Sequence, residues 1–286
     1  YAAYNAVPNI DAVRLKERDD ISVTTDGYSM INPVALIEFN AKEGPFANPA
    51  VRRAISLAID RQFMIDNIFF GYGKPATSAL STNFKPTGLY ASMPNYPARG
   101  DIASAKALLD SAGIKPDANG VRIRAILDLI PYGEDWRRAG EYLKQVLGDI
   151  GIKLELRYED VPTWLKRIYH NYDFVMNVNY FYQLPDPVLG VHRHYGTDQI
   201  RKGTHFVNSS RYSNSELDEL LASGATEANA QKRTQIYKKI QEILARDMPV
   251  VNLFELQFLT VYNTKLKGAY NSALGAYASF SEAYLD

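Results

Sequence analysis

Aromatic and polar side chains gather in one segment, NVNYFYQLPDPVLGVHRHYG, at residues 177–196. A predicted strand ends within it at about Tyr180. Ligands of α/β proteins bind in the crevice beyond the carboxyl ends of strands, and aromatic walls with a few polar groups suit a polar small molecule. We therefore predict a ligand site here, and a tyrosine-rich loop that only packs is the alternative. The candidate ligand-binding residues are Tyr180, Tyr182, Gln183, Asp186, Arg193 and His194.

A second chemical possibility is a metal site. His192 and His194 lie two residues apart, so on a strand they would share a face. No third ligand stands at a diagnostic spacing, and Arg193 lies between the two imidazoles. We therefore favour surface or ligand-contacting histidines and predict no metal and no cofactor, while a metal-binding protein stays an alternative hypothesis.

Catalytic motifs are absent from the sequence. It contains no Gly-x-Ser-x-Gly elbow, no His-Glu-x-x-His pair and no Walker loop. The acidic pairs Glu134/Asp135 and Glu159/Asp160 stand at predicted strand-to-helix junctions, where carboxylates complement a helix dipole. We therefore predict a binding protein and not an enzyme. The alternative is a hydrolase that uses Asp186 or His194 on a bound oligomer.

Composition narrows the class further. The 286 residues carry 32 basic and 32 acidic side chains, so charge gives no case for a nucleic-acid or anionic-membrane partner. The absence of cysteine excludes disulfides and thiolate metal sites. The longest apolar run, residues 249–262, is interrupted by polar residues and predicts no membrane span. The first twenty residues lack a signal-peptide pattern, so a signal has been removed or the chain starts partway through a longer protein.

Periodicity predicts alternating strands and helices, which is typical of an α/β layer. We expect one helix from a cap at Asn48 to the glycines Gly71 and Gly73. Arg52 and Arg61 fall largely outside its apolar stripe, so we expect capping and surface ion pairs from them. Further strands are predicted at 31–40, 121–130, 152–160, 172–180 and from 249, and further helices at 101–113, 133–151, 161–171, 214–227 and 229–247; residues 181–212 are expected to be irregular.

Seven stretches in order, from about residue 30 to about residue 268, resemble the extracellular solute-binding proteins of ABC importers, in the peptide/nickel/opine class (family 5). The stretches are IEFNAKEGPFANPAVRRAISLAIDR, GYGKPATS, DIASAKALLDSAG, GEYLKQVLGDIGIKLELRYED, YDF…DP, NSSRYSNSELDELL and KRTQIYKKIQEILARDMPVVNLFE. The resemblance implies an α/β fold, the C-terminal lobe of a type II periplasmic-binding-protein fold, with a mixed sheet flanked by helices.

The same resemblance implies a division of the chain. Residues 1–38 would be hinge-crossing strands of the first lobe, residues 39–249 the C-terminal ligand-binding lobe, and residues 250–286 the return segment to the first lobe. Family members are usually much longer, so we expect this chain to be the C-terminal portion of a longer protein, an expressed fragment. We expect such a fragment to bind its ligand poorly and to self-associate through its crossing segments.

The implied function is capture of a small peptide or related polar solute by closure of two lobes, followed by delivery to an inner-membrane ABC permease, without catalysis. The implied location is the periplasm, or the cell exterior with a membrane anchor in a bacterium without an outer membrane.

One position departs from the family pattern. In peptide-binding members an aspartate three residues before an Asp-Pro step pairs with the peptide's α-ammonium. Here the step is Asp186-Pro187, and Gln183 stands three residues earlier. An amide lacks the charge that strengthens such a hydrogen bond. The departure implies a neutral, sugar-like, opine-like or anionic ligand, whose acidic group would pair with Arg193 or His194.

Overall fold

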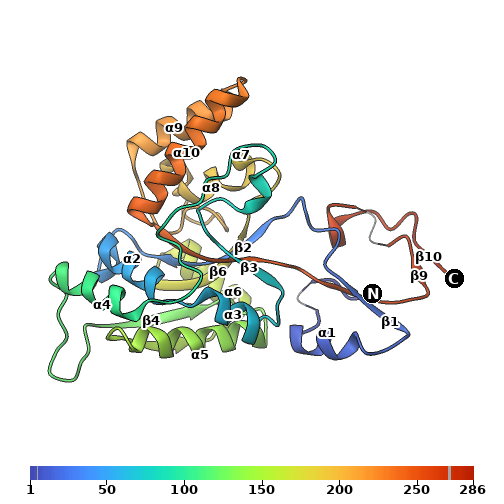
Figure 1. The fold of residues 1–286 in the computed structure, drawn as a ribbon, viewed down its shortest axis with the longest axis horizontal. Coiled ribbons are helices and arrows are strands. Elements are labelled where there is room, and N and C mark those ends of the chain that lie inside the picture. Colours follow the sequence, from blue (N-terminus) through green and yellow to red (C-terminus); the bar gives the residue numbers. More distant parts are fainter. Residues whose placement is uncertain (5, 270–271) are drawn as a thin grey trace.

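The computed structural model describes residues 1–4, 6–269 and 272–286. A body is built on a six-stranded sheet, and a smaller part that holds both chain ends lies beside it (Figure 1). In sheet order the strands are β3 (Gly73–Pro75), β7 (Val250–Leu256), β2 (Pro33–Phe39), β6 (Met176–Tyr182), β4 (Ile123–Leu129) and β5 (Ile152–Arg157). Strand β4 runs parallel to β5 and β6, whereas β2 runs antiparallel to β6 and β7. The predicted mixed α/β sheet is therefore confirmed.

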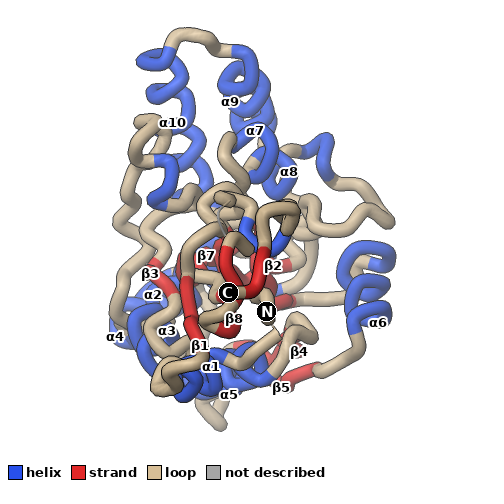
Figure 2. Tube along the Cα trace, turned by 90° about the vertical axis from the view of Figure 1, so that its right-hand side faces the viewer, coloured by secondary structure: helices blue, strands red, loops and turns tan. Residues whose placement is uncertain are grey.

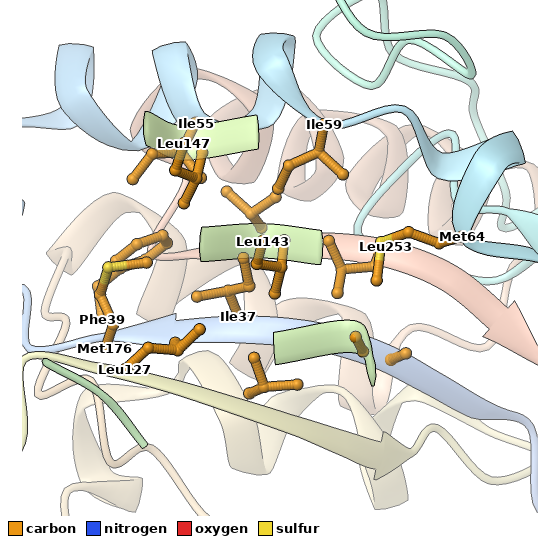
Figure 3. Packing of buried hydrophobic residues seen from close by; sticks show 14 of the residues in the cluster. Ile37, Phe39, Ile55, Ile59, Met64, Leu127, Leu143, Leu147, Met176 and Leu253 are labelled. Carbon is orange, nitrogen blue, oxygen red and sulfur yellow. The ribbon is translucent and has the colours of Figure 1, made fainter. Parts of the chain in front are cut away.

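One face of the sheet is apolar and carries the main core. It is covered by helices α2 (Pro49–Ala58), α3 (Arg61–Asn67) and α5 (Glu134–Gly148), and α4 (Ile102–Ser111) packs against α2. Figure 3 shows Ile55 of α2, Ile59 just after that helix, Ile37 of the sheet and Leu143 of α5 in one cluster. All four of these side chains are essentially inaccessible to water. Burial of this apolar area is the main term that holds the body together.

The single helix expected between Asn48 and Gly71 is two helices. Asn48 caps the first, as predicted, with its Oδ1 2.9 Å from the amide of Ala50. The chain then turns extended at Ile59, and Asp60 caps α3 by accepting from the amide of Phe63 at 2.7 Å. An aspartate that competes for the backbone in this way ends one helix and starts the next.

The expectation that Arg52 and Arg61 make surface pairs is wrong. Arg61 is fully buried, and its guanidinium donates to the carbonyl oxygens of Ser56, Pro97 and Asn252 at 2.9–3.0 Å. Arg52 is buried in the same manner, with Nε 2.7 Å from the carbonyl of Met248. A guanidinium has five donors, and carbonyl oxygens satisfy them without a carboxylate.

The opposite face of the sheet is covered by the remaining helices of the body. They are α6 (Val161–Leu165), a π-helix (Lys166–Asn171), α7 (Pro187–Gly190), α8 (His192–Tyr195), α9 (Ser215–Thr226) and α10 (Ala230–Asp247). Helices α9 and α10 form a hairpin that rises from the body (Figures 1 and 2). The predicted helices 214–227 and 229–247 are thus confirmed, whereas residues 181–212, expected to be irregular, contain α7 and α8. Among the described residues, no helix combines the length and the apolar character that crossing a membrane requires.

A row of polar side chains crosses this second face. Glu38 of β2 pairs in register with Asn177 of β6, which pairs with Asp128 of β4, which pairs with Arg157 of β5. Glu38 and Asp128 are each 1% exposed. Burial raises the pKa of each carboxyl to about 7, although nearby amides and a hydroxyl for Glu38, and Arg157 and Arg167 for Asp128, oppose the rise. The row therefore holds two carboxyls that resist ionisation.

The amides of the row satisfy the buried carboxyl of Glu38. Asn177 Nδ2 and Asn179 Nδ2 donate to Glu38 Oε2 at 2.7 and 3.1 Å, and Ser209 Oγ bonds Oε1. Asn177 Oδ1 in turn accepts from the indole of Trp164 at 2.9 Å. Hydrogen bonding of this kind is what allows polar groups into a core.

The smaller part contains both termini and is formed by the two segments of chain that leave the body, one before Pro33 and one after Leu256. Its elements are α1 (Asn9–Leu15), β1 (Ile21–Thr24), β8 (Thr260–Asn263), β9 (Leu266–Lys267) and β10 (Tyr284–Leu285), with β1 antiparallel to β8 and β9 antiparallel to β10. Figure 2 views the molecule from this side. The expected boundaries at 38/39 and 249/250 do not follow the sheet, because β2 and β7 both belong to the body. The crossings lie before Pro33 and after Leu256.

Candidate functional site

A cavity of about 680 Å³ lies at the carboxyl ends of β4 and β6, which run parallel. The body supplies most of its lining, and the smaller part adds Tyr4 and Tyr277. Its lining residues are Tyr4, Pro131, Tyr132, Gly133, Tyr180, Phe181, Tyr182, Arg193, His205, Phe206 and Tyr277. Ligands bind at this place in α/β sheets, and the volume is within the 300–1,000 Å³ common for small-molecule sites.

Strand β6 positions two tyrosines of the wall. It extends to Tyr182, two residues beyond the predicted end, so Tyr180 and Tyr182 lie on one face of the strand. Tyr180 stacks against Trp136 of α5 with ring centroids 5.6 Å apart and an interplanar angle of 27°. Tyr132 follows β4 directly and lies 5.8 Å from Tyr180, centroid to centroid. The aromatic wall is therefore anchored in the main core.

Three tyrosine hydroxyls join the body to the smaller part. The hydroxyl of Tyr182 donates to that of Tyr4 at 3.1 Å and lies 3.3 Å from that of Tyr277, and Tyr4 and Tyr277 also contact each other through their hydroxyls. Burial raises the pKa of Tyr4 to about 12 and also raises the pKa of Tyr182. Tyr4 and Tyr182 therefore act as neutral donors and acceptors at neutral pH.

Phe258 fixes the crossing segment behind this trio. Its ring stacks on Tyr4 at 4.2 Å and meets Tyr180 edge-on at 5.6 Å. It also lines a second cavity of about 330 Å³ together with Asn32, Ser81 and other polar residues. Phe258 thus lines the second cavity and packs against two tyrosines of the main one.

Arg193 is the one formally charged side chain among the described lining residues of the main cavity. Its Nη2 donates a long bond of 3.4 Å to the carbonyl of Tyr182, and its buried Nε meets no acceptor among the described residues. Burial lowers the pKa of the Arg193 guanidinium, and Tyr169 and Tyr182 oppose that effect weakly. The cavity therefore presents a partly desolvated cation with unused donors.

His205 borders the cavity as a neutral imidazole. Its Nε2 lies 3.0 Å from Nε2 of His170, so one ring donates to the other. Burial and the neighbouring His170 both lower the pKa of His205. Among the described residues, no group of three or more His, Cys, Asp or Glu side chains is placed to hold a metal ion.

Three predicted site residues do not line the cavity. Gln183 is 4% exposed and fastens a neighbouring loop, since its Oε1 accepts from the amide of Ser81 and its Nε2 donates to the carbonyl of Ala79, both at 2.7 Å. Asp186 caps α7 through the amide of Val188 and binds Arg233 with both oxygens at 2.8 and 2.9 Å. These polar groups support the walls of the site from outside.

The third residue, His194, is buried and stacks on Phe181 with ring centroids 3.7 Å apart. Burial, together with the positive charge of Arg193, lowers its pKa well below the ordinary value. The strand geometry considered for His192 and His194 is wrong, because both belong to α8. His192 instead lies 2.9 Å from the hydroxyl of Tyr237, nitrogen to oxygen.

Sequence reasoning missed part of the wall. Tyr132 follows the predicted strand 121–130, just as Tyr182 follows the predicted strand 172–180. The same argument applied to both strands would therefore have found Tyr132. His205 and Phe206 lie in a loop without periodicity, and Tyr4 and Tyr277 come from opposite ends of the chain. For these four residues only the tertiary structure brings the side chains together.

Residues 2–201 match the family model described as bacterial extracellular solute-binding proteins, family 5 Middle. The chain is 26% identical over 236 residues to the glutathione-binding protein GsiB of Salmonella paratyphi A, across 81% of this chain and 44% of that protein. It is 24% identical over 269 residues to di/tripeptide-binding protein 3 of Pseudomonas aeruginosa, across 94% of this chain and 48% of that protein. The chain spans about half the length of the curated relatives it matches.

Solved structures confirm the fold. The oligopeptide-binding protein AppA from Bacillus subtilis, in complex with a nonapeptide, has a TM-score of 0.80 at 20% identity, covering 98% of this chain and 55% of that chain. AgaA from A. tumefaciens R10, in complex with agropinic acid, has a TM-score of 0.82 at 21% identity, covering 99% of this chain and 55% of that chain. These likenesses concern the arrangement of the chain alone.

Proposed function

Because this chain belongs to the bacterial extracellular solute-binding proteins of family 5, we propose that it supplies the C-terminal lobe and the hinge segments of a receptor for an ABC importer. The receptor captures a small peptide or related polar solute and delivers it to a membrane permease. It works outside the cytoplasm, in the periplasm or anchored at the cell exterior, and it performs no catalysis.

The observation that carries this proposal is the composition of the main cavity. Its wall combines Tyr180 and Tyr182 from the sheet with Tyr4 and Tyr277 from the segments that leave the body. A ligand held there touches both parts of the chain, so binding favours one arrangement of the two. Names of relatives supply the ligand classes to test, namely di- and tripeptides and glutathione.

The site residues take two roles in this proposal. Tyr180, Tyr182 and Arg193 contact the solute, since they line the cavity. Gln183, Asp186 and His194 position those groups, because their hydrogen bonds and stacking hold the surrounding loops and α8. No observation in the described residues favours the hydrolase, as neither Asp186 nor His194 reaches the cavity.

Calorimetric titration of the full-length protein with dipeptides, tripeptides, glutathione and opines tests the proposal. We expect saturable binding of one class and recovery of the compound unchanged. Tyr182→Ala should weaken binding about tenfold through loss of one aromatic contact, whereas Tyr284→Ala, at a position 61% exposed, should leave it unchanged. Chemical turnover of the bound compound, or no saturable binding across the panel, would overturn the assignment.

A further inference from the structure

We propose that the main cavity selects a solute with an acidic group on a flat apolar body, and that it disfavours a solute with a free ammonium. This inference rests on the proposed function and names the ligand class of the same site. It is carried by the charges of the lining residues, by the incomplete hydrogen bonding of Arg193, and by the aromatic walls around that residue.

The formal charge among the described lining residues of the cavity is positive only. Arg193 lines it, and no Asp or Glu stands among its described lining residues. The nearby acid Asp186 is bound by both oxygens to Arg233, and the polar Gln183 faces the backbone of Ala79 and Ser81. An ammonium in this cavity would meet a like charge with no carboxylate to offset it.

Arg193, which is half-buried, differs from the buried arginines Arg52 and Arg61 of the body. Arg52 donates to four carbonyl oxygens at 2.5–2.9 Å, and Arg61 donates to three carbonyls and the hydroxyl of Ser56. By contrast, Arg193 donates one bond of 3.4 Å, to the carbonyl of Tyr182, and no carboxylate of the described residues lies within 4.0 Å of it. Its Nε is buried, so the two terminal nitrogens are the groups that can donate parallel hydrogen bonds to a carboxylate.

Partial burial makes the unpaired guanidinium of Arg193 energetically unfavourable. A guanidinium removed from water without a partner is destabilised, and an arriving carboxylate restores the lost interactions. The gain is specific to an acid, because a neutral amide or hydroxyl offers weaker, uncharged acceptors. Arg193 thus distinguishes the charge of a solute and contributes more than a general polar contact.

The other lining residues of the cavity select solutes by shape. Tyr132, Tyr180, Tyr182 and Phe206 present ring faces and edges at angles to one another, and His205 adds a neutral ring. Such walls pack against a planar or aromatic body by offset and edge-to-face contacts. Aromatic walls also attract cations, but the positive charge of Arg193 in the same lining opposes the entry of an ammonium.

Three compounds that share one ring system separate these possibilities. Indole-3-acetate, indole-3-acetamide and tryptamine carry an acid, a neutral amide and an ammonium on the same flat body. Ligand-observed NMR on the full-length protein should detect millimolar or tighter binding. We expect the acid to bind about tenfold more tightly than the amide, as one charge-assisted pair provides, and the amine to bind most weakly.

Two variants assign the difference to one side chain. Arg193→Gln should abolish the preference for acid over amide while leaving affinity for the amide within about twofold, a change of under 0.5 kcal/mol. The matched control is Arg137→Gln, because Arg137 lies on the far side of Gly133 in a neighbouring cavity and lies over the ring of Tyr158. This control should retain the full preference.

The outcomes separate the two proposals. Equal binding of acid and amide, tighter binding of tryptamine, absence of binding by all three compounds, or a preference that survives Arg193→Gln would overturn the ligand class. Saturable binding of a peptide or another solute by the full-length protein would still uphold the receptor function. Failure of the full-length protein to bind any solute would instead remove the receptor function itself.

Discussion

The two faces of the central sheet bury charge in opposite ways. Helices α2 and α3, on the apolar face, carry the guanidiniums of Arg52 and Arg61, which are held by carbonyl oxygens. The other face carries the carboxyls of Glu38 and Asp128, the first of which is held by amide and hydroxyl donors. Burial of Arg52, Arg61 and Glu38 therefore rests on neutral hydrogen-bond partners and does not require an ion pair. Asp128 differs, because its oxygens accept no hydrogen bond from the described residues, and its Oδ1 lies 3.5 Å from Nε of Arg157 and 3.9 Å from Nε of Arg167.

The largest effect is expected from Arg61→Met on the apolar side. The substitution keeps an apolar stem but leaves the carbonyl oxygens of Ser56, Pro97 and Asn252 without their donors. We expect the free energy of unfolding to fall by about 4 kcal/mol, because each unsatisfied buried acceptor costs about 1–3 kcal/mol. Urea denaturation followed by circular dichroism measures it.

Arg99→Met is the control for Arg61→Met, because its side chain is 68% exposed and its pair with Asp60 is long. It should change stability by less than about 0.5 kcal/mol. A loss below 1 kcal/mol for Arg61→Met would show that the carbonyls find other partners and that the cation is dispensable on this face.

Leu143→Ala examines the apolar core itself. Leu143 of α5 is fully buried in the cluster of Figure 3, so the truncation removes apolar contacts and leaves a cavity. We expect a loss of about 3 kcal/mol, equal at pH 5 and pH 8, because the side chain is buried in an apolar cluster. Leu189→Ala, at a position 58% exposed, should cost almost nothing. A loss for Leu143→Ala that varies with pH would mean that the two faces are coupled.

On the polar face, Glu38→Gln should stabilise the fold, whereas the two substitutions on the apolar face destabilise it. Folding raises the pKa of Glu38 from 4.5 to about 7 by burial, so between these values the unfolded chain binds fewer protons than the folded chain. Stability therefore falls as pH rises through this range and is constant above it. The amide of Gln keeps an acceptor for Asn177 and Asn179 without the buried charge.

Relative to the parent chain, Glu38→Gln should be about neutral at pH 4 and more stable at pH 8 by at most about 3 kcal/mol, the equivalent of a pKa change from 4.5 to about 7. Melting temperatures across pH 4–8 measure this, with the exposed Glu155→Gln as the control. A variant less stable than the parent chain at pH 8 would show that the charged form of Glu38 is favoured in the fold.

Sequence reasoning recovered the apolar face more fully than the polar one, for a physical reason. The alternation of Ile37 and Phe39 with polar neighbours, and the spacing of Leu143 and Leu147, are local patterns that survive in the sequence. The burial of Arg61 is not local, since its partners Pro97 and Asn252 are distant in sequence. Its charge predicted exposure, and only the fold supplies the carbonyls that reverse the prediction.

The candidate site follows the same rule. Tyr180, Tyr182 and Arg193 were placed near one another by a strand end and the loop after it, which is local information. The position of Gln183, three residues before Asp186, predicts a ligand contact, but its side chain bonds a loop about a hundred residues earlier in the chain. Spacing along a loop fixes which residues are near the cavity and leaves open which way each one faces.

The smallest effects are expected at two helix caps, where the difference between the faces should vanish. Asn48 caps α2 on the apolar face and Asn229 caps α10 on the other, with Oδ1 2.9 Å from the amide of Ala50 and 3.0 Å from that of Lys232. Asn48→Ala and Asn229→Ala should each cost about 1 kcal/mol, since a cap satisfies one amide of its own helix whatever the helix packs against. Parallel urea titrations of the two variants measure both losses. Losses that differ by more than about 1 kcal/mol would mean that the stability a cap contributes depends on which face of the sheet its helix covers. The contrast between the two faces would then extend to the helices that cover them.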